Sequence, residues 1–203
     1  MRRAARGSRT SSTWVWGLRS SGARRRICGV LAAALAAGTP ASAGVFHSRS
    51  EALALAFPDA ERIEDKTWVL SEAQAARIQA LSRSPLESRL VTIHTAIRAG
   101  APEGYALIDV HTVRTLPEAF MVVLTPEGAV RSVRMLAFHE PLDYLPPERW
   151  YGQFERKTLA EALRLGGDIH GVVGATLSTQ AATRGVRRAL AFYEVLLRPP
   201  APQ

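Results

Sequence analysis

A threonine that follows two small residues, close to the start of a predicted helix, is the strongest candidate for chemistry in this chain. The stretch is Gly174-Ala175-Thr176-Leu177-Ser178. A helix N-terminus has unpaired N–H groups and a partial positive charge, so it suits a phosphate group. Gly174 and Ala175 would let a bulky group approach the backbone. The same residues are also typical of a plain turn and helix N-cap, because Ser and Thr side chains bind free N–H groups there.

The stretch resembles a motif of the FMN-binding domain family, whose pattern is roughly D-x-x-[ST]-G-A-T-x-[ST]. That family includes covalently flavinylated exported proteins, similar to the flavin subunits of Rnf-type and Na⁺-pumping quinone reductase complexes. The resemblance implies that Thr176 carries FMN as a phosphoester. It also implies that Gly174, Ala175, Leu177 and Ser178 belong to the cofactor site.

A second segment carries the same resemblance, which covers roughly residues 100–197. Residues 139–144, with the sequence H-E-P-L-D-Y, are similar to the family's E-T-P-G-L-G loop, which follows a hairpin and lies beside the flavin. The resemblance thus places Glu140 and Pro141 at the ring, where a carboxylate would disfavour the reduced anion and lower the redox potential. His139 could relay a proton with Glu140. A solvated loop is the alternative interpretation of both side chains.

The pattern is not matched at every position. Aligned on Thr176, the chain has His170 where the family usually has Asp, and Val173 where it usually has Ser or Thr. The differences at these two positions would affect recognition by a flavin transferase more than they would affect the fold.

The first 43 residues are predicted to be a secretory signal peptide. Arg24-Arg25-Arg26 precede an apolar run over 27–37, and Ala41-Ser42-Ala43 is an A-x-A cleavage site. A spanning helix needs about 20 apolar residues, so no permanent membrane span is expected. A mitochondrial-type transit peptide is the alternative, and both Sec and twin-arginine export fit the basic flank. We therefore expect a periplasmic or otherwise exported bacterial protein.

The charge of the mature chain excludes one class of function. The formal charge of +8 comes from 26 basic and 18 acidic residues, and eight arginines with no acidic residue lie in the leader. Residues 44–203 therefore carry no net charge, and we expect no nucleic-acid partner. The single cysteine, Cys28, also lies in the leader. The mature chain therefore has no thiolate with which to bind a metal, an iron–sulfur cluster or a haem.

Periodicity predicts an α+β fold, an antiparallel sheet with flanking helices in a single domain after the cleaved signal peptide. Residues 44–100 would form an N-terminal extension of helix and strand, and the resemblance implies that 101–198 form the FMN-binding domain. The expected helices cover 50–55, 72–82, 158–167 and 178–197. The expected strands cover 90–97, 105–113, 119–124, 130–138 and 169–173, with a hairpin turn at 126–128.

Other side chains have a structural interpretation that we favour. Three aromatic residues could cover a flavin ring but more often pack in a core: Trp150, Tyr151 and Phe154. Three arginines on the last helix could face a phosphate or an acidic partner but more often face solvent: Arg184, Arg187 and Arg188. The five histidines lack metal-ligand spacing, so we expect no metal site.

The leader and the resemblance together imply an exported electron-transfer protein with covalent FMN. We expect a flavin transferase for its modification and a membrane or haem-containing redox partner. The mature chain has no nucleotide-binding glycine fingerprint and no nucleophile elbow, which favours a carrier over a self-sufficient enzyme. The alternative is a periplasmic binding or structural module that keeps the fold without flavin.

Overall fold

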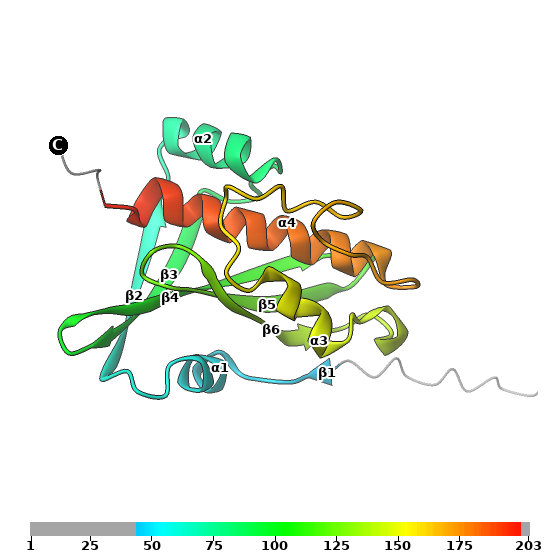
Figure 1. The fold of residues 1–203 in the computed structure, drawn as a ribbon, viewed down its shortest axis with the longest axis horizontal. Coiled ribbons are helices and arrows are strands. Elements are labelled where there is room, and N and C mark those ends of the chain that lie inside the picture. Colours follow the sequence, from blue (N-terminus) through cyan, green and yellow to red (C-terminus); the bar gives the residue numbers. More distant parts are fainter. Residues whose placement is uncertain (1–43, 200–203) are drawn as a thin grey trace, which may run out of the picture. The chain divides into compact units, whose positions relative to one another are not determined.

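The computed structural model describes residues 44–199, and the predicted signal peptide lies outside them. These residues form a six-stranded, fully antiparallel sheet in the order β1-β6-β5-β4-β3-β2, with helices against it (Figure 1). The strands are β1 Gly44–Val45, β2 Arg62–Val69, β3 Leu90–Arg98, β4 Ala101–Thr112, β5 Pro117–Leu124 and β6 Val130–Phe138. The predicted α+β class is confirmed.

The helices lie on both faces of the sheet. Figure 1 shows α4 along one face with α2 outside it, and α1 on the opposite face. Their bounds are α1 Arg49–Ala56, α2 Glu72–Ser82, α3 Glu148–Tyr151 and α4 Thr176–Phe192. Two 3₁₀ turns, η1 Leu142–Tyr144 and η2 Gly152–Phe154, and a π-helical turn, η3 Tyr193–Leu197, complete the set. No helix within residues 44–199 is both long and apolar enough to cross a membrane.

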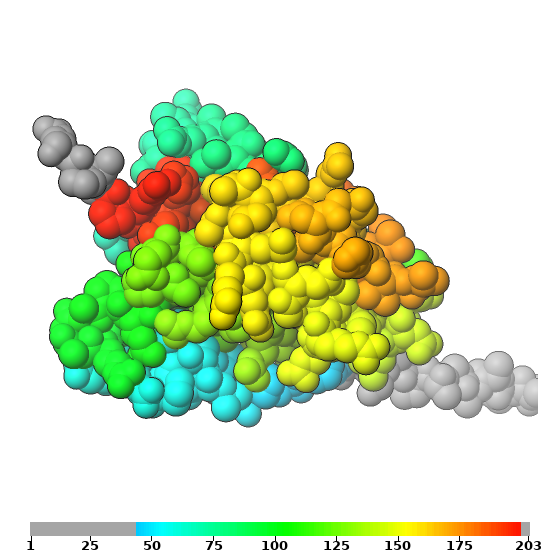
Figure 2. Space-filling view, in the orientation of Figure 1, coloured from blue at the N-terminus to red at the C-terminus, as the bar shows by residue number. Residues whose placement is uncertain are grey.

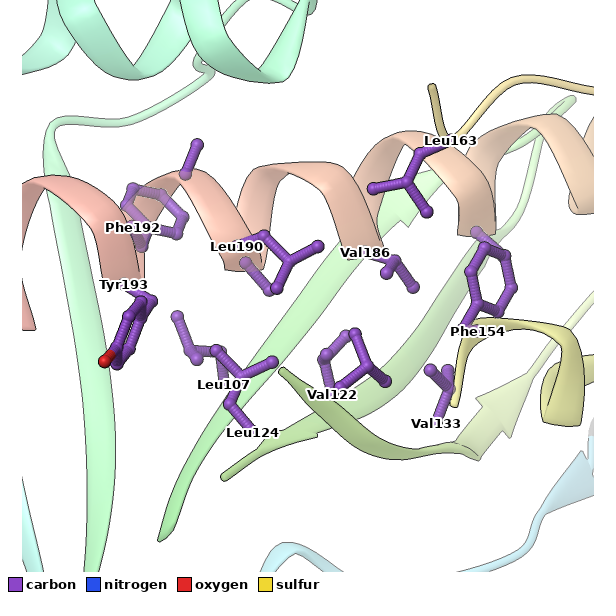
Figure 3. Close-up of a cluster of buried hydrophobic side chains, with 14 of the residues drawn as sticks. Leu107, Val122, Leu124, Val133, Phe154, Leu163, Val186, Leu190, Phe192 and Tyr193 are labelled. Atoms are coloured by element: carbon purple, nitrogen blue, oxygen red, sulfur yellow. The ribbon is translucent and has the colours of Figure 1, made fainter. Parts of the chain in front are cut away.

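Alternation along the central strands builds a separate core on each face. On the α4 side, Leu107 and Val122 lie beneath Val186 and Leu190 (Figure 3). On the α1 side, a smaller cluster contains Ala52, Leu53, Ala106, Met121 and Val123. The larger of these two cores, on the α4 side, holds α4 against the sheet.

One glycine sets how closely α4 approaches the sheet. A Cβ at Gly185 would clash with the ring of Phe120 and lie 3.1 Å from the carboxylate of Asp109. The absent side chain brings the helix down onto β4 and β5. This contact fixes where the N-terminal turn of α4 lies relative to the end of β4.

Most predicted elements are present, and the capping signal of α2 is confirmed. The Ser71 hydroxyl accepts the N–H of Gln74, whose side chain accepts the N–H of Ser71, and the helix covers the expected 72–82. The β5–β6 hairpin is also present, with Gly128 at φ 84°. These features depend on neighbouring residues, so a local pattern predicts them well.

Two strands of the sheet differ from expectation. Strand β2 was not predicted, because its sequence R-I-E-D-K-T-W-V alternates poorly and mostly faces solvent at the sheet edge. Strand β4 starts at Ala101 and runs through a proline and a glycine that predicted a loop. Pairing of β3 with β4 joins residues 44–100 and 101–198 in one sheet.

The segment before α4 contradicts two predictions. The helix expected over 158–167 is absent: the Glu161 carboxylate accepts the Thr158 N–H at 2.8 Å, but only a turn forms, and Leu163 has a left-handed backbone with φ 45°. The Asp168 carboxylate accepts the N–H groups of Leu163 and Arg164 at 2.9 and 2.8 Å. The strand expected over 169–173 is reduced to one bridge between Leu165 and Ile169. Side-chain acceptors take the backbone donors here, so neither regular structure forms.

Candidate functional site

Thr176 is the first residue of α4, two residues earlier than the predicted start at Ser178. Its N-cap is Ala175, and no side chain caps the helix. Within the described residues, no hydrogen bond occupies the N–H groups of Thr176, Leu177 and Ser178. The helix therefore begins with three free donors and its partial positive charge.

Burial distinguishes the three hydroxyl groups of this turn. Thr176 is exposed, whereas Ser178 is 2% and Thr179 0% exposed. The Thr179 hydroxyl also donates to the Thr176 carbonyl oxygen at 2.9 Å. Of these three residues, only Thr176 is exposed to solvent.

Gly174 gives the chain its sharp entry into the helix. Its φ is 87°, a region that residues with side chains rarely adopt. A Cβ there would meet only the Asp143 carbonyl oxygen, at 4.0 Å. The backbone angle therefore demands a glycine, and the space beside it is open. Ala175 next to it is buried and donates its N–H to Val172.

Glu140 is buried and its carboxylate is occupied by backbone. One oxygen, Oε1, accepts the N–H groups of Arg114, Thr115 and Leu116 at 3.2, 2.9 and 3.0 Å. These hydrogen bonds, led by the one from Thr115, lower the pKa of Glu140. An ionised carboxylate therefore shapes the connection between β4 and β5.

The structure brings most of the predicted site residues around one small cavity beside the start of α4. Its volume is about 10 Å³, and Glu140, Gly174, Ala175, Leu177 and Ser178 are among the residues that line it. Val113, Arg114 and Tyr144 complete the lining. Pro141 does not line this cavity. It follows Glu140 in the chain and is the N-cap of η1.

Arg114 was not predicted as a site residue. Its guanidinium lies 4.4 Å from the centroid of the Tyr144 ring, at the same cavity. Arg114 is 60 residues before Gly174 in the chain, and only the sheet brings the end of β4 to α4. An arginine in a turn after a strand gives no sequence signal for this placement.

A larger groove lies along the other side of Leu177. Its volume is about 440 Å³, and it is lined by the 83–87 segment, the end of β4 and one stripe of α4. The charged side chains in its lining are Arg83, Glu87, His111, Arg184 and Arg188. Two larger cavities, of about 600 and 660 Å³, contain no residue of the first turn of α4.

A chain of ion pairs lies behind this groove. Arg188 binds Asp109, His111 donates from Nδ1 to Asp109 at 2.8 Å, and His111 donates from Nε2 to Glu118 at 2.7 Å. Burial lowers the pKa of His111, but the hydrogen bonds to Asp109 and Glu118 outweigh it and raise the pKa to about 9. For Asp109, burial is likewise outweighed by His111 and Arg188, and its pKa is lowered. His111 is therefore a cation at neutral pH.

The aromatic segment belongs to the core, as its structural interpretation predicted. Trp150, Tyr151 and Phe154 are buried, and Trp150 packs edge-on against the other two rings. Trp150 also donates its indole N–H to the His170 carbonyl oxygen at 2.6 Å. This bond holds the segment that leads into α4. In the space-filling view, the same segment covers much of that helix (Figure 2).

The arginines of α4 have different surroundings. Arg187 is buried and donates to the carbonyl oxygens of Leu81 and Ala162 at 2.8 and 2.9 Å. Arg188 binds Asp109, and Arg184 is exposed. The solvated face predicted for all three therefore describes Arg184 alone. His170 and Val173, the two residues that differ from the family motif, are both exposed.

Residues 44–199 contain no group of three or more His, Cys, Asp or Glu side chains that could hold a metal ion. Comparison with protein-family models found no match to the chain. Comparison with curated proteins found no significant match either.

Proposed function

We propose that the chain is an exported electron-transfer protein that carries FMN through a phosphoester to Thr176. The observation that carries this proposal is an exposed hydroxyl at the uncapped start of a long helix, directly after a glycine at positive φ. The motif resemblance names the same threonine. Ser178 and Thr179, the other hydroxyl groups of the turn, are buried.

The surrounding groups suit the phosphate end of the cofactor. The three free N–H groups of the first turn favour a bound anion, and the Arg114 guanidinium adds positive charge at the adjoining cavity. The open space beside Gly174 admits a group bound to Thr176. FMN would supply one- and two-electron transfer, which ordinary side chains do not. A covalent bond would keep the cofactor in place outside the cytoplasm.

We propose a carrier and not a self-sufficient enzyme. Electrons would come from a membrane or haem-containing partner and pass to another protein. The net charge of zero over residues 44–203 favours weak encounters with little salt dependence. A flavin-free binding module is the competing function, and the substitutions at His170 and Val173 are the feature that favours it.

Flavinylation is tested by expressing the protein with a flavin transferase, FAD and Mg²⁺. The Thr176 hydroxyl would lose its proton and bond to the FMN phosphorus, while the pyrophosphate bond of FAD breaks and AMP leaves. The peptide with Thr176 should gain one FMN mass, and a fluorescent band should survive denaturation. Thr176→Val should abolish both signals, and Thr176→Ser, which keeps a hydroxyl, should retain them.

Two outcomes would contradict this assignment. Flavin retained in Thr176→Val but lost in Ser178→Ala would move the attachment to another hydroxyl. A folded wild type that never acquires FMN beside an active transferase would favour the flavin-free module.

Export is tested separately. The Arg-rich flank, the apolar run and the A-x-A site predict that the exported form starts at Gly44, within a few residues. N-terminal sequencing of a periplasmic fraction measures this, and a full-length product confined to the cytoplasm would contradict it.

A further inference from the structure

Two spaces flank the start of α4, and they differ in size and charge. Both contain Val113 and Leu177 in their lining. We propose that the isoalloxazine ring lies in the groove of Arg83, His111 and Arg184, and not in the Glu140 cavity. This inference rests on FMN attachment at Thr176 and adds the residues that surround the ring.

Size favours the groove. Ligand and cofactor pockets usually measure about 300–1,000 Å³, and the groove has about 440 Å³. The Glu140 cavity has about 10 Å³, which is at the lower limit for a single water molecule. A three-ring system fits the first space without rearrangement of the fold and would have to open the second.

The direction of α4 also leads from Thr176 to the groove. Gln180 follows Thr176 by four residues, so the two share a face of the helix. Gln180 lines the groove, as do Leu177, Ala181 and Arg184 of the neighbouring stripe. A cofactor attached at Thr176 that extends along α4 therefore enters the groove.

Glu140 is in turn poorly placed to face a ring. Its Oε1 accepts three backbone N–H groups, and the residue is only 4% exposed. Moving it would break the connection between β4 and β5. The Glu140 carboxylate therefore positions the loop that borders the attachment site.

Charge gives the groove a specific effect on the cofactor. Arg83 and Arg184 make no ion pair within the described residues, and His111 is protonated at neutral pH. Asp109 and Glu118 balance the charges of His111 and Arg188, and Glu87 is the one carboxylate in the lining, so the excess positive charge comes from Arg83 and Arg184. Positive charge near a ring that accepts electrons stabilises its reduced form and raises the midpoint potential.

The first test measures ring accessibility. Ala181→Leu narrows the groove, while Tyr144→Leu alters the cavity on the other side. On the flavinylated proteins, Ala181→Leu should at least double the acrylamide quenching constant of flavin fluorescence, and Tyr144→Leu should leave it unchanged. FMN mass on the Thr176 peptide should be equal in the three proteins, and the far-UV spectrum verifies folding.

The second test measures the potential. Arg184→Gln should lower the midpoint potential of the flavin, whereas Arg77→Gln, which removes an exposed charge from α2, should not. Wild-type potential in Arg184→Gln together with wild-type quenching in Ala181→Leu would overturn the groove assignment, and a response to Tyr144→Leu alone would move the ring to the Glu140 side. Absence of FMN from the wild type would instead refute the attachment itself.

Discussion

The two sides of the α4 N-terminus differ in what their carboxylates do. On one side, Glu140 binds three backbone N–H groups and closes a loop around a cavity of about 10 Å³. On the other side, Glu118 and Asp109 hold a protonated His111 behind a groove of about 440 Å³. A buried carboxylate thus serves loop geometry in one place and charge placement in the other. Residue type alone does not distinguish the two roles, because each depends on which donors the fold brings near.

Among substitutions on the two sides of α4, Glu140→Leu should have the largest effect on stability and on flavin attachment. It leaves the N–H groups of Arg114, Thr115 and Leu116 without their acceptor, so the β4–β5 connection should lose its shape. We expect a clearly lower thermal midpoint and slower flavin attachment, measured by calorimetry and fluorescence. Glu140→Gln retains an amide oxygen and should be much milder.

Glu140→Gln also tests on which side of α4 the ring lies, because it removes a charge from the Glu140 side alone. If the carboxylate faced the ring, removing its charge would raise the midpoint potential. With the ring in the groove, the potential should stay close to that of the wild type. A rise in potential at unchanged attachment would restore the sequence-based expectation.

The next effect is a pH dependence from His111. Its pKa rises from 6.5 to about 9 on folding. The charged form therefore stabilises the fold fully below pH 6.5, and this stabilisation is lost as the pH rises through 9. The shift corresponds to roughly 3 kcal/mol at most. Urea unfolding at pH 6 and at pH 9.5 should show a loss in the wild type that is absent in His111→Asn.

The contribution of Asp109 to stability depends on pH with the opposite sign. Its pKa is lowered on folding, so its contribution is present above about pH 4 and is lost in acid. His111→Asn should also make the loss of stability in acid less steep, since Asp109 then keeps only Arg188 as a partner and its pKa is lowered less. An alkaline slope equal in wild type and variant would show that the ion-pair chain does not stabilise the fold.

Gly174→Ala should have a smaller effect on stability. A left-handed backbone costs a residue with a side chain about 1–2 kcal/mol, and Gly174 has a φ of 87°. The Cβ itself has room, so the protein should fold with a modestly lower unfolding free energy. Gly100→Ala, at φ 77° and also with open space, is the matched control. Only Gly174→Ala should slow flavin attachment.

The smallest effect concerns the approach to Thr176. His170 and Val173 are exposed, so replacing them should leave stability nearly unchanged. His170→Asp with Val173→Thr should raise the initial rate of flavin attachment toward that expected of the full motif. An unchanged rate would mean that the transferase depends on the turn and the helix start alone.

Local signals predicted a large part of the fold. Ser71 and Gln74 set the start of α2 because a capping box involves only neighbouring residues. Strand β6 was predicted at its observed bounds, Val130–Phe138. The Thr158–Glu161 pair has the same capping pattern but closes only a turn. The Asp168 carboxylate then binds the N–H groups that a helix would have used.

The sequence by itself placed a glycine turn, a hydroxyl group and a helix start within a few consecutive residues, and the motif resemblance implied that this hydroxyl is the attachment site. The sequence could not place Arg114, Arg83 or His111 beside that hydroxyl. Their positions depend on strand pairing and on the close approach of α4 at Gly185. Only the tertiary structure decided that the Glu140 carboxylate binds a loop while the opposite side of α4 is open and positive. The physical reason is that a charge acts through its neighbours in space, and most of these neighbours are distant in the chain.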